Sequence, residues 1–195
     1  MHTACTRRHA VAHPWSAFVR MALALLLVCP FAVGAHDLSE AQVKAAYIHN
    51  FAKFVEWPAE AFAAAQAPLV LCVAGKDGLG GALAAIEGKP VQGRDLRIKR
   101  AVGTDEVRTC HMLFVSEGDE KSVGEVLRAV GALPVLTIGD VDGFAAAGGA
   151  IGFVPRDDRV LFEINPDAAK RANLKISSQL LRLAIIVQYG RRFRL

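Results

Sequence analysis

Short apolar runs alternate with helix-like segments along most of this chain, and that alternation limits the possible folds more than any other feature. Strands that alternate with helices predict a single α/β domain, with a mostly parallel sheet that helices cover on both faces. The expected strands are Leu69–Ala74, Leu96–Ala101, His111–Ser116, Val135–Ile138, Ile151–Val154 and Val160–Ile164. The expected helices between several of them are Gly78–Ile86, Glu120–Val130 and Val141–Ala147.

The C-terminal part of the pattern departs from this alternation. The runs Ile151–Val154 and Val160–Ile164 are separated only by the letters PRDDR. This link is too short for a parallel crossover, so the pair predicts an antiparallel β-hairpin at one end of the sheet. A last helix is expected over Ser178–Tyr189, with Ser177 or Ser178 as its N-cap.

A helix is also expected near the start of the apolar pattern. The letters SEAQ, which begin at Ser39, form a capping box, and Tyr47, Phe51 and Phe54 follow at helical spacing. This helix should end near Glu56, because Pro58 disfavours the α conformation of the residue before it. We expect the three rings to cover one face of the sheet; direct contact with a partner is the alternative.

Residues 1–35 have the features of a secretory signal peptide. This stretch contains three arginines and no acidic residue, and an apolar run follows the arginines over Met21–Ala35. Val33 and Ala35 occupy the −3 and −1 positions of a cleavage site before His36. We therefore predict cleavage near Ala35/His36 and one exported α/β domain over residues 36–195. A retained N-terminal anchor is the alternative.

Removal of this segment changes how charge and cysteine are interpreted. The remaining chain has 20 basic residues, which is 23 minus the three arginines, against 19 acidic ones. Near-neutral charge argues against nucleic acid as a partner. Cys72 and Cys110 are the two cysteines left, both beside apolar runs, and an oxidising compartment favours a structural disulfide between them. Two buried free thiols are the alternative.

No pattern of catalytic or metal-binding residues appears along the sequence. The letters VAGKDGLGG, Val73–Gly81, follow a strand but match neither common phosphate-binding motif. The histidines His36, His49 and His111 lack the spacing of metal ligands. We therefore predict a protein that is not an enzyme and that holds no metal or cofactor. The alternative is a small-molecule receptor with a crevice near Gly75–Gly80 and Ser116–Asp119, at the carboxyl ends of strands.

The two ends of the exported chain carry its most distinctive letters. They are YIHNFAKFVEWP, Tyr47–Pro58, and LFEINPDAAKRANLKISSQLLRLA, Leu161–Ala184. In order and in content, these blocks resemble the YfiR-like family of periplasmic regulators. Strand alternation turns Glu163 away from the face of Phe162, toward solvent or a partner. Glu163, Asn165 and Arg182 are our predicted partner contacts.

This resemblance implies a non-enzymatic repressor in the periplasm. Similar proteins bind the periplasmic part of an inner-membrane diguanylate cyclase and keep it inactive, which lowers cyclic-di-GMP and biofilm formation. An outer-membrane, peptidoglycan-associated lipoprotein captures them and releases the cyclase. The resemblance also implies a homodimer and a core disulfide at Cys72 and Cys110. The best-known member has a second cysteine pair in the region of Ala145–Gly152, which this chain lacks, so redox control through that pair is not implied.

Overall fold

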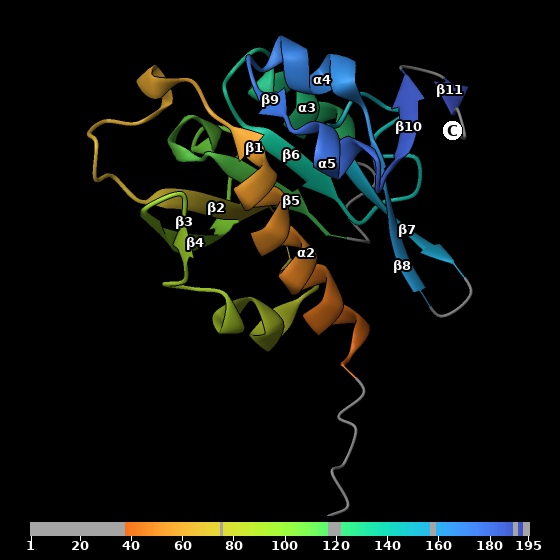
Figure 1. The fold of residues 1–195 in the computed structure, drawn as a ribbon, viewed down its shortest axis with the longest axis horizontal. Helices are drawn as coiled ribbons and strands as arrows, with labels where there is room; N and C mark the ends of the chain where they lie inside the picture. Colours follow the sequence, from red (N-terminus) through yellow and green to blue (C-terminus); the bar gives the residue numbers. More distant parts are fainter. Residues whose placement is uncertain (1–37, 75, 117–121, 157–158, 189–190, 193–195) are drawn as a thin grey trace, which may run out of the picture. The chain divides into compact units, whose positions relative to one another are not determined.

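Most of the strands join one sheet in the computed structural model, which describes residues 38–74, 76–116, 122–156, 159–188 and 191–192 (Figure 1). The nine strands of this sheet follow the order β11-β10-β8-β7-β6-β5-β2-β4-β3. They are β2 (Leu69–Ala74), β3 (Pro90–Val91), β4 (Arg94–Val102), β5 (Met112–Val115), β6 (Leu136–Gly139), β7 (Ile151–Arg156), β8 (Arg159–Ile164), β10 (Ile185–Gln188) and β11 (Arg191–Arg192). Leu38–Leu195 form one compact unit.

Helices and a small second sheet complete the fold. The helices are α2 (Glu40–Phe54), α3 (Val123–Val130), α4 (Pro166–Arg171) and α5 (Ser178–Leu181), with 3-10 turns η2 (Ala59–Ala61), η3 (Gly80–Ala85) and η4 (Val107–Thr109). The second sheet pairs β1 (Val55–Glu56) with β9 (Lys175–Ile176). The predicted signal peptide and its two cysteines lie outside the described residues. No helix in the described ranges is long and apolar enough to cross a membrane.

The centre of the sheet is parallel, as the sequence predicts. Strand β2 pairs in parallel with β4 and β5, and β5, β6 and β7 continue the parallel order. The predicted hairpin is the antiparallel pair β7–β8, in which Phe153 lies opposite Phe162. Contrary to the prediction, the hairpin is not the end of the sheet, because β10 pairs in parallel with β8 beyond it and β11 adds an antiparallel edge. The mostly parallel α/β fold is therefore confirmed.

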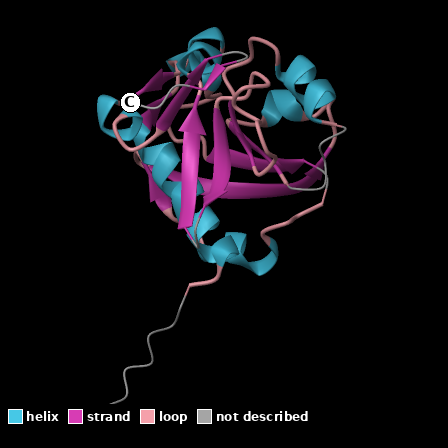
Figure 2. Cartoon of the chain, turned by 90° about the vertical axis from the view of Figure 1, so that its right-hand side faces the viewer, coloured by secondary structure: helices cyan, strands magenta, loops and turns pink. Residues whose placement is uncertain are grey.

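Both faces of the sheet are buried, because successive side chains of a strand point to opposite sides. On β2, Leu71 and Val73 belong to a core under α2, η3, α4 and α5, whereas Cys72 and Ala74 belong to a second core under α3 and η4. Figure 2 shows helices on both sides of the strands. The sulfur bridge between Cys72 and Cys110 lies in the second core and spans a Cα–Cα distance of 5.8 Å. The structural disulfide is thus confirmed.

The predicted capping box starts α2. The Ser39 hydroxyl accepts a hydrogen bond from the backbone N–H of Gln42, and the Gln42 side chain accepts one from the Ser39 N–H. The helix ends at Phe54, two residues before the predicted position near Glu56, because Val55 is already extended. At this end, the Gln92 side chain donates to backbone carbonyls of α2 and β1, at 2.8–2.9 Å for Ala52 and Val55.

The aromatic stripe of α2 packs into the first core, as predicted. Phe51 is fully buried, and its ring centroid lies 4.9 Å from that of Phe162 and 5.8 Å from that of Phe153. Tyr47 stacks on Phe51 at 5.8 Å and contacts Phe162 at 5.5 Å. These rings join α2 to the β7–β8 hairpin, so burial of aromatic surface fixes the helix on the sheet.

Two predicted helices are wrong, and a third, α3, is present and ends at Val130 as predicted but starts later. Gly78–Ile86 forms the 3-10 helix η3 instead, because consecutive glycines weaken an α-helix and Gly80 has φ +49°. Val141–Ala147 forms turns, with φ +69° at Gly143. Residues 120 and 121 lie outside the described ranges, and α3 begins at Val123.

The predicted last helix over Ser178–Tyr189 is mostly wrong. Only α5 is helical there, and its N-cap is Ser177, whose hydroxyl accepts from the Leu180 N–H. Residues Ile185–Gln188 form β10 instead, because β8 offers a free edge and β-branched residues suit a strand. The end of the predicted helix at Tyr189 lies outside the described residues.

Candidate partner-binding surface

The two distinctive sequence blocks form one continuous structure. Val55 pairs with Ile176 and Glu56 pairs with Lys175 in the antiparallel β1–β9 sheet. The backbone N–H of Ser177 extends this pairing by donating to the Phe54 carbonyl at 2.9 Å. Leu174 and Leu180 on the C-terminal side join the same core as Phe51. The front and back blocks therefore specify a shared piece of core rather than two separate sites.

Glu163 does not face solvent, so that part of the prediction is wrong. It is 2% exposed, in a strand that pairs on both sides, with Gly152 on β7 and Ile185 on β10. Strand alternation does turn it away from the first core, which holds Phe162. Glu163 is nevertheless buried, and strand alternation could not show this, because it gives the face on which a side chain lies and not what packs against that face.

Asn165 is fully buried and supports the fold around it. Its side-chain oxygen accepts hydrogen bonds from the N–H groups of Asp167 and Ala168, both at 3.1 Å, and so caps α4. Its amide nitrogen donates to the Ala145 carbonyl at 2.9 Å, which ties α4 to the turn before β7. These contacts use the polar atoms of Asn165 inside the protein, and they leave no exposed surface for a partner.

Arg182 is the predicted contact residue that does lie on the surface. It is the exposed C-cap of α5, in the turn that leads to β10. The next residue, Leu183, is 74% exposed. A large apolar side chain at that exposure is suited to contact with another protein when further apolar surface lies nearby.

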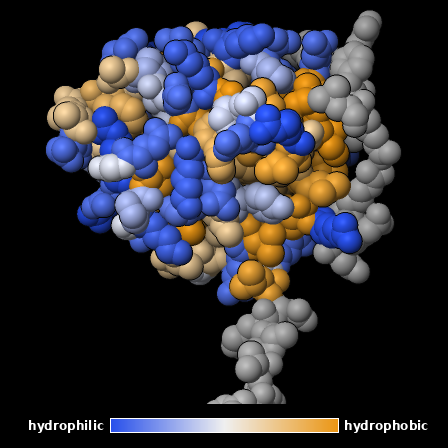
Figure 3. Space-filling view, viewed as in Figure 1, coloured by the Kyte–Doolittle hydropathy of each residue, from blue (hydrophilic) through white to orange (hydrophobic). Residues whose placement is uncertain are grey.

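A groove between α2 and β8 also presents apolar surface. Its volume is about 610 Å³, and its lining residues are Leu38, Glu40, Val43, Tyr47, Arg159, Val160 and Leu161. Leu38 is 63% exposed. In Figure 3, apolar side chains run down the right-hand side of this face to the start of α2. We call these seven residues the α2–β8 groove.

Sequence reasoning missed this groove, although one signal was present. Val160 and Leu161 are consecutive apolar residues at the start of β8, and strand alternation puts one on each face. Both remain half-buried rather than buried, as does Val43 near the start of α2. An apolar pair beside the turn of the hairpin therefore indicated that apolar surface would remain uncovered.

A buried ion pair fixes the α2 side of the groove. The ammonium group of Lys44 lies 2.7 Å from the Asp140 carboxylate and 2.6 Å from that of Glu40. Burial by itself would lower the pKa of Lys44, but the hydrogen bonds to Asp140 and Glu40 outweigh it and raise the pKa above its usual value. Lys44 thus stays charged and holds the first turns of α2 to the carboxyl end of β6.

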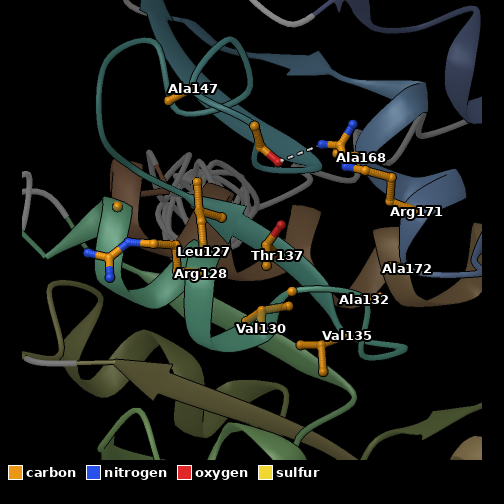
Figure 4. A pocket seen from close by; sticks show the side chains of 13 residues that line it. Leu127, Arg128, Val130, Ala132, Val135, Thr137, Ala147, Ala168, Arg171 and Ala172 are labelled. Carbon is orange, nitrogen blue, oxygen red and sulfur yellow. Dashed lines mark hydrogen bonds between the residues drawn. The ribbon is translucent and has the colours of Figure 1, made fainter.

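A second cavity lies between α3, the start of β6 and α4, with a volume of about 600 Å³. Arg128 on α3 and Arg171 on α4 line it together with small and apolar side chains, as Figure 4 shows. Arg171 donates to the Gly148 carbonyl at 3.4 Å. Thr137 is on its floor and accepts a hydrogen bond from the Ala150 N–H at 2.8 Å. The cavity combines apolar walls with two cations.

A family model described as YfiR/HmsC-like matches residues 41–185. The chain belongs to the YfiR/HmsC-like family. The match covers 145 of the 195 residues, from the first turn of α2 to the first residue of β10. It therefore includes both sequence blocks and the Cys72–Cys110 bridge.

The other polar residues of this YfiR/HmsC-like chain do not gather into a metal centre. Across the described ranges, no three His, Cys, Asp or Glu side chains lie close enough together to hold a metal ion. Of the receptor crevice that the sequence suggested, Gly75 and residues 117–119 lie outside these ranges. Ser116 is buried, and its hydroxyl accepts a hydrogen bond from the Gly78 N–H at 2.9 Å.

Proposed function

We propose that this protein is a non-enzymatic periplasmic regulator that binds the periplasmic part of an inner-membrane diguanylate cyclase and represses it. Its presence then lowers cyclic-di-GMP and biofilm formation. Membership of the YfiR/HmsC-like family supports this class of function. The geometric observation that carries the proposal is the α2–β8 groove, an apolar surface large enough to receive side chains of another protein.

The charges around the groove fit a protein partner. Glu40 and Arg159 lie among its apolar residues, so a complementary surface can form oriented ion pairs at the rim. The floor residue Tyr47 rests on the rings of Phe51 and Phe162, which hold it in place before a partner arrives. A rigid aromatic group with an apolar surround is typical of the centre of an interface.

Gene deletion followed by measurement of cyclic-di-GMP tests the regulatory function. We expect deletion to raise cyclic-di-GMP and the wild-type gene to restore the lower concentration. An unchanged concentration after deletion, in cells that hold the active cyclase, would contradict the proposed function.

Complementation with surface variants tests the groove separately. Val43→Glu places a charge on the α2 side of the groove, and we expect it to restore repression poorly. The matched control is Ala65→Glu, which adds the same charge at an exposed position in the loop after η2. Exported protein levels and melting temperatures of both variants must equal those of the wild type. Full repression by Val43→Glu would exclude the groove as the contact surface while leaving the regulatory function intact.

Arg182 remains a proposed contact, whereas Glu163 and Asn165 act in the proposal only by supporting the fold. An Arg182→Ala variant should weaken repression without a change in stability, because its side chain is exposed.

A homodimer, and release by an outer-membrane, peptidoglycan-associated lipoprotein, also form part of the proposal. Sedimentation of the exported protein tests the dimer.

A small-molecule receptor is the second candidate function, and the cavity between α3 and α4 favours it. Two arginines beside apolar walls suit a small molecule that carries a carboxylate. A shift in melting temperature with a panel of carboxylates, lost in Arg171→Gln, would support this function. The two functions are compatible, because the cavity and the α2–β8 groove share no lining residue.

A further inference from the structure

The buried ring of His111 holds the loop between β1 and β2 against the main sheet. His111 is 9% exposed and stands just before β5. Its Nδ1 atom accepts a hydrogen bond from the Val70 N–H at 3.1 Å, and its Nε2 atom lies 3.1 Å from the Ala61 carbonyl oxygen. Both contacts are satisfied by one protonation state, the neutral ring with its proton on Nε2.

The same loop makes further contacts around this ring. Phe62 stacks on His111 with a centroid distance of 4.5 Å, and the Arg94 guanidinium lies 3.6 Å from the centre of the Phe62 ring. Arg94 also donates to the carbonyls of Ala64 and Ala67, at 3.2 and 2.6 Å. The loop contains no helix or strand except η2, so these side chains provide much of its attachment.

A third cavity lies beneath the loop. Its volume is about 310 Å³, and its walls include Ala61 and Ala67 from the loop and Cys110 and Leu133 from the body of the domain. His111 is also part of the wall. Movement of the loop away from the sheet would therefore widen this cavity.

We infer that His111 is an acid-sensitive latch, which holds residues 59–68 against the sheet when neutral and releases them when it is protonated. Protonation places a second N–H on the ring, at Nδ1, where it points at the Val70 N–H. Two donors then face each other in a buried position, and the Val70 N–H loses its acceptor. In the released state the imidazolium and the Val70 N–H can both bind water.

The surroundings of the ring oppose its protonation. Burial lowers the pKa of His111; the hydrogen bond to Ala61 acts in the opposite direction, and the nearby Arg94 charge lowers the pKa further. The charged side chains on the elements around the ring are Glu60 in the loop, Arg108 on η4, and Arg94, Asp95, Arg97, Lys99 and Arg100 on β4; β2 and β5 add none. Of these charges, Arg94 is the one that acts on the pKa of His111. The attached state is thus fully favoured above pH about 6.5, the ordinary histidine value, and loses that advantage as pH falls toward the lowered pKa.

Hydrogen exchange of the full-length chain tests the latch. The informative amides are those of Ala61, Phe62, Ala67 and Val70, which have hydrogen-bond acceptors in the attached state. After correction for intrinsic exchange rates, we expect their protection to fall by up to about tenfold per pH unit below pH 6.5. Amides of β6, which is buried at the centre of the sheet, should keep constant protection over the same range.

Two variants that cannot titrate serve as matched controls. In His111→Asn, the side-chain oxygen can accept from the Val70 N–H; in His111→Gln, the longer amide can donate to the Ala61 carbonyl. We expect the protection of residues 59–68 to be lower overall and independent of pH in both. The inference is overturned if wild-type protection of this segment stays constant from pH 7.5 to 5, or if either variant shows the wild-type pH dependence.

Discussion

Removal of the disulfide gives the sharpest test of how this fold is stabilised. The proposed change is the double substitution Cys72→Ala and Cys110→Ala. Cys72 lies on β2 and Cys110 ends η4 just before β5, and both are buried in the second core. The bridge closes a chain segment with a sequence separation of 38, which contains η3, β3 and β4. Alanine keeps the Cβ atoms, so the main loss is the covalent link.

The expected magnitude follows from the length of this closed segment. For a separation of 38, the chain-entropy model gives about 13 cal/mol/K, or about 4 kcal/mol at 25 °C. The total free energy of unfolding of a domain is about 5–15 kcal/mol. The variant should therefore retain a marginal fold, with a melting temperature about 8–16 °C below that of the wild type.

Urea denaturation of a chain that spans residues 36–195 measures this effect. We expect the double variant and the reduced wild type to give the same free energy of unfolding, about 4 kcal/mol below that of the oxidised wild type. The denaturant slope should rise when the link is lost, because an open unfolded chain exposes more surface. A difference of less than about 1 kcal/mol in unfolding free energy would refute the entropic argument.

Three further predictions concern glycine, a helix end and pH. Gly139→Ala should lower the free energy of unfolding by about 3 kcal/mol in urea denaturation, because the new Cβ would lie 2.2 Å from the Phe144 ring. The control Gly124→Ala should be neutral or stabilising, because its Cβ would meet open space. Gln92→Gly should lower the free energy of unfolding by about 1–2 kcal/mol, because the hydrogen bonds to the end of α2 are lost. Gln92→Ala should lower it further, because φ is +50° at this position. Equal stability of Gln92→Gly and wild type would contradict this. The melting temperature should decrease as the pH is lowered below 6.5, since burial also lowers the pKa of His49. His49→Gln should make this decrease smaller, and an unchanged dependence of melting temperature on pH would argue against this.

Local patterns in the sequence predicted the elements whose conformation depends on near neighbours. The capping box at Ser39 and the run Leu69–Ala74 appear in the structure as predicted. The hairpin at residues 151–164 was also predictable, because the length of a connection limits the possible pairing. Capping, strand alternation and loop length all act over a few residues, so the sequence of one short segment is enough to predict its conformation.

The last segment shows where this reasoning ends. Ile185 and Ile186 fit a helical pattern and a strand pattern equally well, and pairing with Glu163 and Ile164 on β8 decides between them. Glu163 on β8 is buried as well, although strand alternation alone placed it toward solvent or a partner. The α2–β8 groove was equally out of reach, because its two sides are far apart in the chain.

The sequence by itself determined the central strands, the capped start of α2, the hairpin and the two cysteines that bond, because these depend on local hydrogen bonds, spacing and composition. The tertiary structure decided which surfaces remain exposed and which polar groups become buried. Burial is a property of the neighbours that a segment acquires on folding, and for Asn165 and His111 those neighbours include residues 20 and 50 positions away. A binding surface is what these contacts leave uncovered, so it can be recognised only after every strand has found its partner.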